Sequence, residues 1–273
     1  MTDIDPIRRN NVKVVGNPQA QTALVFVHGF GSDQRAWSSV AAAFLADYRV
    51  VLLDNVGAGG SDPAAFAQHR YLNLRRYGSD LVEVCDALAL DRPVLVGHSM
   101  GAMICALATL ERPGLARQLV MIGASPRYVD VDDYLGGFSR EDVDAIYSSV
   151  TSSYSAWADG FAAASMAHGD RPTLGSEFAQ SIKSIPPDRA LTMLCSIFQS
   201  DHREDIARLE VPTLVLQTRQ DIAVPLAVAE YLNRRIRGSR LEIIDTEGHL
   251  PHVSAPGLVA RAIRHFITEA GPA

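Results

Sequence analysis

Cysteine, basic charge and long apolar runs are all scarce in this sequence. Its 273 residues include three cysteines, Cys85, Cys105 and Cys195, too scattered for a disulfide framework or a zinc site. A formal net charge of −6 argues against a nucleic-acid partner. No apolar run is long enough for a membrane span, and the polar segment 1–6 does not have the pattern of a secretory signal peptide. We therefore expect a cytoplasmic protein with no metal site and no nucleic-acid or membrane partner.

Apolar, strand-like runs alternate with stretches of helical spacing along most of the chain. With 47% hydrophobic residues, 273 residues are enough for one large core. The run Ala23–His28 is apolar almost throughout, which is typical of a strand buried on both faces. Similar runs begin at residues 12, 49, 94, 118, 212 and 240. Because strands and helices alternate, the pattern predicts an α/β fold with a doubly wound, mostly parallel sheet.

The segment 130–200 has a different sequence pattern from the rest of the chain. Its β-branched runs stop, helical spacing takes over, and Ser139-Arg-Glu-Asp142 has the pattern of a capping box. We predict four short helices that form a lid over the strand ends, with the core formed by 1–129 and 201–273. The breaks between these helices are expected at Thr151–Ser153, Gly169–Pro172 and Ile185–Pro187. Many aromatic side chains in the lid suggest a dry apolar pocket beneath it.

The stretch Gly97-His98-Ser99-Met100-Gly101 separates an apolar β-branched run from an Ala- and Leu-rich helical run. A Gly-x-Ser-x-Gly turn in this setting holds its serine in a strained backbone conformation, exposed at the carboxyl end of the strand. We expect both glycines to be required because a Cβ atom there would crowd the strand–helix crossing. Ser99 is therefore the candidate nucleophile, and the Met100 N–H, at the start of the helix, is a candidate oxyanion donor.

A second oxyanion donor is expected in the turn that follows the second strand. The sequence there is His28-Gly29-Phe30-Gly31, whose glycines let the backbone turn sharply, and we assign the donor to the Phe30 N–H. His28 is expected to brace this loop rather than to transfer protons. The glycine-rich stretch Asn55–Ser61 has no helix directly after it, so we do not interpret it as a nucleotide site and expect no cofactor.

A base and an acid follow two later strands. Serine needs a neutral imidazole to take its proton and a carboxylate to orient that imidazole. Asp221 and His249 come just after strand ends, in the chain order Ser, Asp, His. His252 and Asp245 are the alternatives for the base and the acid.

Longer motifs resemble one α/β-hydrolase subfamily, which contains the plant strigolactone and karrikin receptors and the bacterial stress-signalling hydrolase RsbQ. The resemblance extends over nearly the whole chain. The motifs are His28-Gly-Phe-Gly-Ser-Asp-Gln34, Ser125-Pro-Arg-Tyr128, Tyr134-Leu-Gly-Gly-Phe138, Ser196-Ile-Phe-Gln-Ser-Asp201, Asp221-Ile-Ala-Val-Pro225 and Gly248-His-Leu-Pro251.

The resemblance implies an α/β-hydrolase fold with a four-helix lid, a Ser99–Asp221–His249 triad, and oxyanion donors at Phe30 and Met100. It implies small butenolide-type lactones or other hydrophobic molecules as ligands, without a cofactor. For the bacterial members it implies a signalling partner, a PAS-containing phosphatase. The implied pocket is lined by Phe30, His98, Tyr128, Phe138, Trp157, Phe161, Phe198, Ile222 and Ala223.

Two functions fit these features. The first is a serine hydrolase that cleaves a small hydrophobic ester or butenolide-type lactone through an acyl-enzyme. The alternative is a ligand sensor whose slow hydrolysis serves signalling through a partner protein. Another chemistry on the same scaffold, such as C–C hydrolysis, perhaloperoxidase activity or acyl transfer, stays open.

Overall fold

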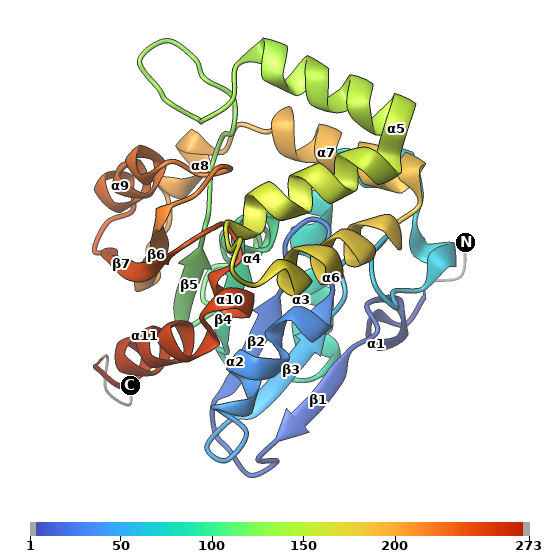
Figure 1. Ribbon diagram of the computed structural model, residues 1–273. Coiled ribbons are helices and arrows are strands. Elements are labelled where there is room, and N and C mark those ends of the chain that lie inside the picture. The colour runs from blue at the N-terminus through green and yellow to red at the C-terminus, as the bar shows by residue number, and fades with distance from the viewer. Residues whose placement is uncertain (1–3, 270–273) are drawn as a thin grey trace.

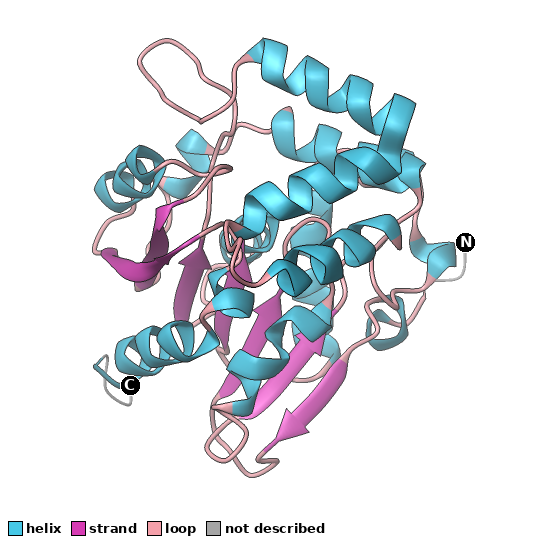
Figure 2. Ribbon diagram, in the orientation of Figure 1, coloured by secondary structure: helices cyan, strands magenta, loops and turns pink. Residues whose placement is uncertain are grey.

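A twisted sheet runs through the middle of the molecule, with helices on both of its faces (Figures 1 and 2). The computed structural model describes residues 4–269. The predicted core ranges and the segment 1–6 therefore include a few residues that lie outside the described part. Within residues 4–269, seven strands form one sheet in the order β1-β3-β2-β4-β5-β6-β7. The strands are β1 (Lys13–Gly16), β2 (Ala23–Val27), β3 (Arg49–Leu53), β4 (Val94–His98), β5 (Gln118–Ile122), β6 (Thr213–Gln220) and β7 (Arg240–Glu247).

The prediction of a mostly parallel, doubly wound sheet is confirmed. Strand β1 pairs antiparallel with β3, and the other neighbouring strands pair parallel. Alternate residues of β2 enter different cores: Val25 packs in the cluster with α3 and α4, and Phe26 in the cluster with α2 and α11. Each face of the strand is thus covered, which explains the continuous apolar run.

The covering helices follow the strands in the alternating order that the sequence predicts. None of the described helices is both long and apolar enough to cross a bilayer. The helices outside the predicted lid are α1 (Pro6–Arg9), α2 (Ser38–Ala42), α3 (Leu74–Ala87), α4 (Met100–Glu111), α8 (Arg203–Ile206), α9 (Leu226–Arg235), α10 (Pro251–Ser254) and α11 (Pro256–Glu269), with 3-10 turns η1 (Gln34–Trp37), η2 (Pro63–Ala65) and η3 (Gln68–Arg70).

Helices α5 (Arg140–Met166), α6 (Pro172–Lys183) and α7 (Pro187–Phe198) lie between β5 and β6 in the sequence. Figure 1 shows them together at one end of the sheet. Helix α5 begins with a capping box in which Ser139 and Asp142 bond each other's backbone, and it contains a non-helical residue, Ser153 (φ −151°). That break falls inside the predicted Thr151–Ser153 segment. The division into a core and a lid at residues 130 and 200 stays a prediction.

Candidate active site

Ser99 occupies a sharp turn between β4 and α4. Its backbone has φ 53° and ψ −121°, a strained conformation for a non-glycine residue. A Cβ atom on Gly97 would lie 2.4 Å from the Gly101 carbonyl oxygen, and one on Gly101 would lie 2.3 Å from the Val27 carbonyl oxygen. The predicted need for both glycines is confirmed. The turn therefore holds the serine side chain at the carboxyl end of the sheet.

The hydroxyl, an imidazole and a carboxylate meet at this end of the sheet. Ser99 Oγ lies 2.9 Å from His249 Nε2, and His249 Nδ1 lies 2.8 Å from Asp221 Oδ2. Because the carboxylate accepts, Nδ1 carries the ring proton and Nε2 is left to accept the serine proton. Ser99 and His249 are both buried. The arrangement can remove a proton from the hydroxyl and stabilise the resulting imidazolium.

Hydrogen bonds from several elements hold the imidazole and the carboxylate. Asp221 Oδ1 accepts from the backbone N–H groups of Ala223 (2.8 Å) and Val224 (3.1 Å). The His249 N–H donates to the Ser165 carbonyl oxygen at 2.7 Å, in the last turn of α5. His98 Nε2 donates to the His249 carbonyl oxygen at 2.7 Å. The histidine loop is thus fixed both by the serine turn and by the predicted lid.

The alternative base and acid lie elsewhere. The His252 ring packs 4.3 Å from the His98 ring and 4.4 Å from the Trp37 ring. Burial, with a smaller contribution from the neighbouring histidines, lowers the pKa of His252 to about 3. Asp245 is exposed and pairs with Arg219 at 2.9 Å. Between these alternatives the geometry favours His249 and Asp221.

The two candidate oxyanion donors flank Ser99. Met100 is the first residue of α4, where backbone N–H groups have no helical acceptor. The turn that carries Phe30 lies directly against the serine: a Cβ atom on Gly29 would lie 2.8 Å from His98 Nδ1 and 3.1 Å from Ser99 Cβ. The assignment of the Phe30 and Met100 N–H groups as oxyanion donors stays a prediction.

A narrow apolar cavity of about 40 Å³ opens onto Ser99 and His249. Predicted residues that line it are Phe30, Tyr128, Phe138, Trp157, Phe161, Phe198 and Ala223. Two other predicted pocket residues are not in this lining: the His98 ring lies 4.8 Å from the His249 ring, and Ile222, half exposed, lines a separate outer hollow. A larger open hollow of about 500 Å³ between η1 and α6 contains no candidate catalytic residue.

Several cavity residues and one polar contact of Ser99 are not predicted by the sequence. Tyr128 OH lies 3.2 Å from Ser99 Oγ, and burial raises the pKa of this phenol, so it stays protonated beside the serine. The missed apolar residues have the helical spacing of a buried face, but spacing alone does not indicate which neighbour that face meets. They are Ile146, Phe178, Leu194 and Ile197.

A mostly parallel sheet with a serine turn, an imidazole and a carboxylate at its carboxyl edge defines an α/β-fold serine hydrolase. The family model described as alpha/beta hydrolase fold matches residues 22–256, and the chain belongs to this family.

Named relatives cover nearly the whole chain. It is 39% identical to "Karrikin insensitive 2 receptor IA" of Petunia hybrida, with 94% of this chain and 95% of the relative aligned. It is 40% identical to "Strigolactone esterase D14" of Arabidopsis thaliana, with 94% and 96% aligned. Among solved structures, a hydrolase from Oleispira antarctica is 30% identical and superposes with a TM-score of 0.93 over 97% of this chain and 96% of the other.

Proposed function

We propose that this protein cleaves a small, neutral, hydrophobic ester or butenolide-type lactone through an acyl-enzyme on Ser99. The observation that carries the proposal is the continuous contact from Ser99 Oγ through His249 to Asp221 at the base of an apolar cavity. These contacts support acyl transfer, because a serine nucleophile needs a base within hydrogen-bond reach and a third group that orients the base.

In the proposed mechanism, His249 Nε2 takes the Ser99 proton as the hydroxyl oxygen attacks the carbonyl carbon. The Phe30 and Met100 N–H groups stabilise the negative charge that forms on the carbonyl oxygen. The imidazolium then gives its proton to the leaving oxygen, which in a lactone stays attached to the acyl group. Water, activated by His249, releases the acid and restores the serine.

The cavity supports a neutral substrate. Apart from His249, the lining side chains that carry polar atoms are Ser99, Tyr128 and Trp157, and these three are neutral; the remaining lining is aliphatic or phenyl. A charged substrate group would lose its hydration there without gaining a counter-ion. The relatives named as a strigolactone esterase and a karrikin receptor agree with a small apolar ligand.

The decisive variant is Ser99→Ala. We expect it to lower turnover of a short-chain nitrophenyl ester by on the order of 10⁴-fold or more while the melting temperature stays close to that of the wild type. Intact-protein mass spectrometry with a labelled butenolide should detect an adduct on the wild-type protein, mapped to Ser99 or His249. Unchanged turnover in Ser99→Ala would refute the proposed mechanism.

A ligand sensor is the second candidate. It is favoured by the bond from the His249 N–H to the Ser165 carbonyl oxygen. Through this bond, a shift of His249 on acylation of Ser99 would move the last turn of helix α5. We propose that such signalling passes to a partner protein in the cytoplasm, a PAS-containing phosphatase if the likeness to RsbQ extends to partners. A large thermal shift with a butenolide and very few turnovers would support sensing; rapid multiple turnover without a partner would support metabolism.

A further inference from the structure

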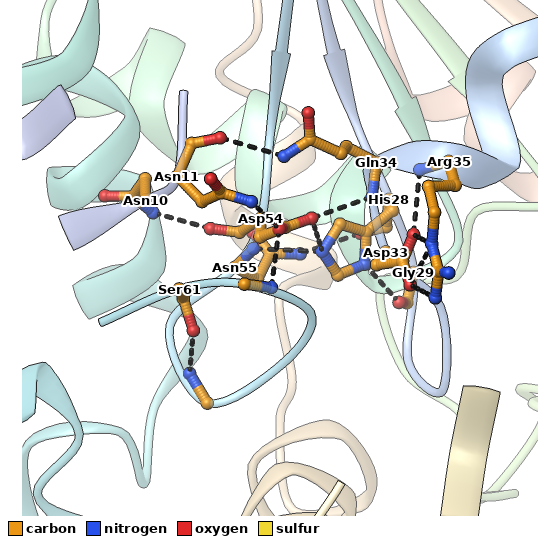
Figure 3. Close-up of polar contacts among 12 residues, drawn as sticks. Asn10, Asn11, His28, Gly29, Asp33, Gln34, Arg35, Asp54, Asn55 and Ser61 are labelled. Atoms are coloured by element: carbon orange, nitrogen blue, oxygen red, sulfur yellow. Dashed lines mark hydrogen bonds and ion pairs between the residues drawn. The ribbon is translucent and has the colours of Figure 1, made fainter. Parts of the chain in front are cut away.

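The turn that carries Phe30 is held at both ends by two residues that follow β3. Figure 3 shows Asp54 and Asn55 in a polar network with His28, which ends the preceding β2 run, and Gln34, which begins η1. Asp54, Asn55, His28 and Gln34 are all buried, at 3% exposure or less. These contacts are outside the proposed triad and outside the substrate cavity.

Asn55 holds the beginning of the turn. Its backbone N–H donates to His28 Nε2 at 2.9 Å, and its side-chain amide donates to the His28 carbonyl oxygen at 2.8 Å. His28 Nδ1 in turn donates to the Gly29 carbonyl oxygen at 2.8 Å. Burial lowers the pKa of His28, so the ring stays neutral and can both donate and accept. The peptide groups next to Phe30 are thereby tied to β3.

Asp54 holds the end of the turn. Its Oδ1 accepts from the Gln34 N–H at 2.8 Å. Its Oδ2 accepts from the Gly60 N–H at 2.8 Å and from Asn11 Nδ2 at 2.7 Å. Gln34 Nε2 also donates to the Asn11 carbonyl oxygen at 2.8 Å. The carboxylate therefore cannot shift without breaking contacts to the N-terminal segment and to its own loop.

The turn between these anchors has little stiffness of its own. Gly29 and Gly31 flank Phe30, and Gly31 has φ +74°, a conformation that glycine adopts easily and leaves easily. A catalytic donor must nevertheless stay within a few tenths of an ångström of its place. The required rigidity has to come from outside the turn, and Asp54 and Asn55 supply contacts at both ends.

We propose that Asp54 and Asn55 are positioning residues that fix the Phe30 N–H for oxyanion binding. This inference rests on the proposed serine-hydrolase function. It predicts that loosening either end of the turn lowers kcat, because the developing negative charge loses a well-placed donor, while KM changes little. A purely structural role would instead change the melting temperature and leave kcat per folded site unchanged.

The variants separate the two ends. Asn55→Ala removes the side-chain bond to His28. Gln34→Pro removes the N–H that Asp54 accepts, at a position where proline fits: Gln34 begins a 3-10 turn and Asp33 before it is extended (φ −142°, ψ −178°). Gln34→Ala keeps the N–H but loses the same side chain, so comparison with Gln34→Pro isolates the bond to Asp54.

Ser61→Ala is the matched control. Ser61 is buried in the same loop and accepts from the Gly57 N–H at 3.0 Å, apart from the turn (Figure 3). The first measurement is kcat and KM per active site, with active sites titrated by a fluorophosphonate. The second is the Kd of phenylboronic acid, because an oxygen of its serine adduct takes the oxyanion position. The third is amide hydrogen exchange of residues 29–34, followed by mass spectrometry.

We expect kcat to fall by about 10- to 100-fold in Asn55→Ala, and similarly in Gln34→Pro relative to Gln34→Ala, with KM within about twofold. Boronate binding should weaken in parallel and exchange in 29–34 should rise, with no such change in Ser61→Ala. Folded variants with wild-type kcat, or an equal loss in Ser61→Ala, would overturn the proposal. If the wild type does not turn over esters but exchange still rises in the variants, the anchoring stands and the proposed function fails.

Discussion

Gly123 follows β5 directly beneath the imidazole and the carboxylate. It has φ +54°, and a Cβ atom there would lie 3.3 Å from His249 Cε1 and 3.7 Å from Asp221 Oδ2. Any side chain at position 123 would therefore strain the backbone and press on His249 and Asp221. The apolar run Gln118–Gly123 predicts a strand that ends at this glycine, but the sequence gives no sign that the position lies against His249 and Asp221.

We predict that Gly123→Ala lowers kcat by about tenfold or more, because displacement of His249 misaligns the proton transfer from Ser99. Stability should also fall by about 1–2 kcal/mol from the left-handed backbone. Gly114→Ala is the control, since Gly114 has φ +82° and open space around it. Steady-state kinetics with thermal unfolding would test this, and equal kcat losses in both variants would contradict it.

The residues of the candidate triad could be predicted because each follows a strand end, and parallel strands bring those ends to one edge. The contacts around these residues could not be predicted without knowing the fold. His98 was expected in the pocket, yet its ring turns toward the His249 carbonyl oxygen, and sequence does not say which side of a turn a ring faces. Asp54 likewise gives no sign in the sequence that it bonds Gln34, twenty residues earlier.

At the scale of elements, apolar runs located all seven strands of residues 4–269, whereas the predicted helix ends were less accurate. The i, i+3, i+4 spacing of Leu81, Val84, Cys85 and Leu88 predicts a helix from Tyr77 to Leu90. Helix α3 instead spans Leu74–Ala87, and it begins early because Asn73 caps it at the Arg75 N–H. The sequence also predicts a helix that carries Trp37, Val40 and Phe44 and is capped by Ser32 or Asp33. The structure has a 3-10 turn there, followed by the short α2. Helix propensity competes there with the packing of Trp37 and Phe44 against Phe26. Such contacts between distant residues cannot be predicted from the local sequence pattern.

The residue that follows helix α5, Ala167, is a non-glycine residue in the left-handed conformation (φ 53°, ψ 20°). Glycine is the preferred residue at such a position because it has no Cβ to strain. We predict that Ala167→Gly raises the free energy of unfolding by about 0.5–1 kcal/mol. Urea denaturation would measure the change.

The matched variant for that test is Ala164→Gly, three residues earlier in the same helix and also exposed. It should lose about 1 kcal/mol, because glycine costs conformational entropy in a helix interior. A loss of stability in Ala167→Gly, equal to that in Ala164→Gly, would show that the helix end gains nothing from glycine.

At the scale of the whole molecule, three buried histidines link stability to pH. Burial lowers the pKa values of His28, His98 and His252, in the last case to about 3 from an ordinary value of 6.5. Between the folded and the unfolded pKa, the unfolded chain binds more protons than the folded one, so stability falls as pH decreases below about 6.5. Asp80 acts in the opposite direction, since burial raises its pKa, but from an ordinary value of 3.8.

We therefore predict that the free energy of unfolding decreases from pH 6.5 to 5, with each buried histidine contributing up to about 1.4 kcal/mol per pH unit. His252→Phe should reduce this slope by about one proton, because phenylalanine can occupy the space between Trp37 and His98 without titrating. Urea denaturation at a series of pH values would measure both slopes. If a folded His252→Phe protein has an unchanged slope, His252 takes up its proton equally in the folded and the unfolded state. If the wild type gains stability toward pH 5, the three rings are not buried as neutral bases.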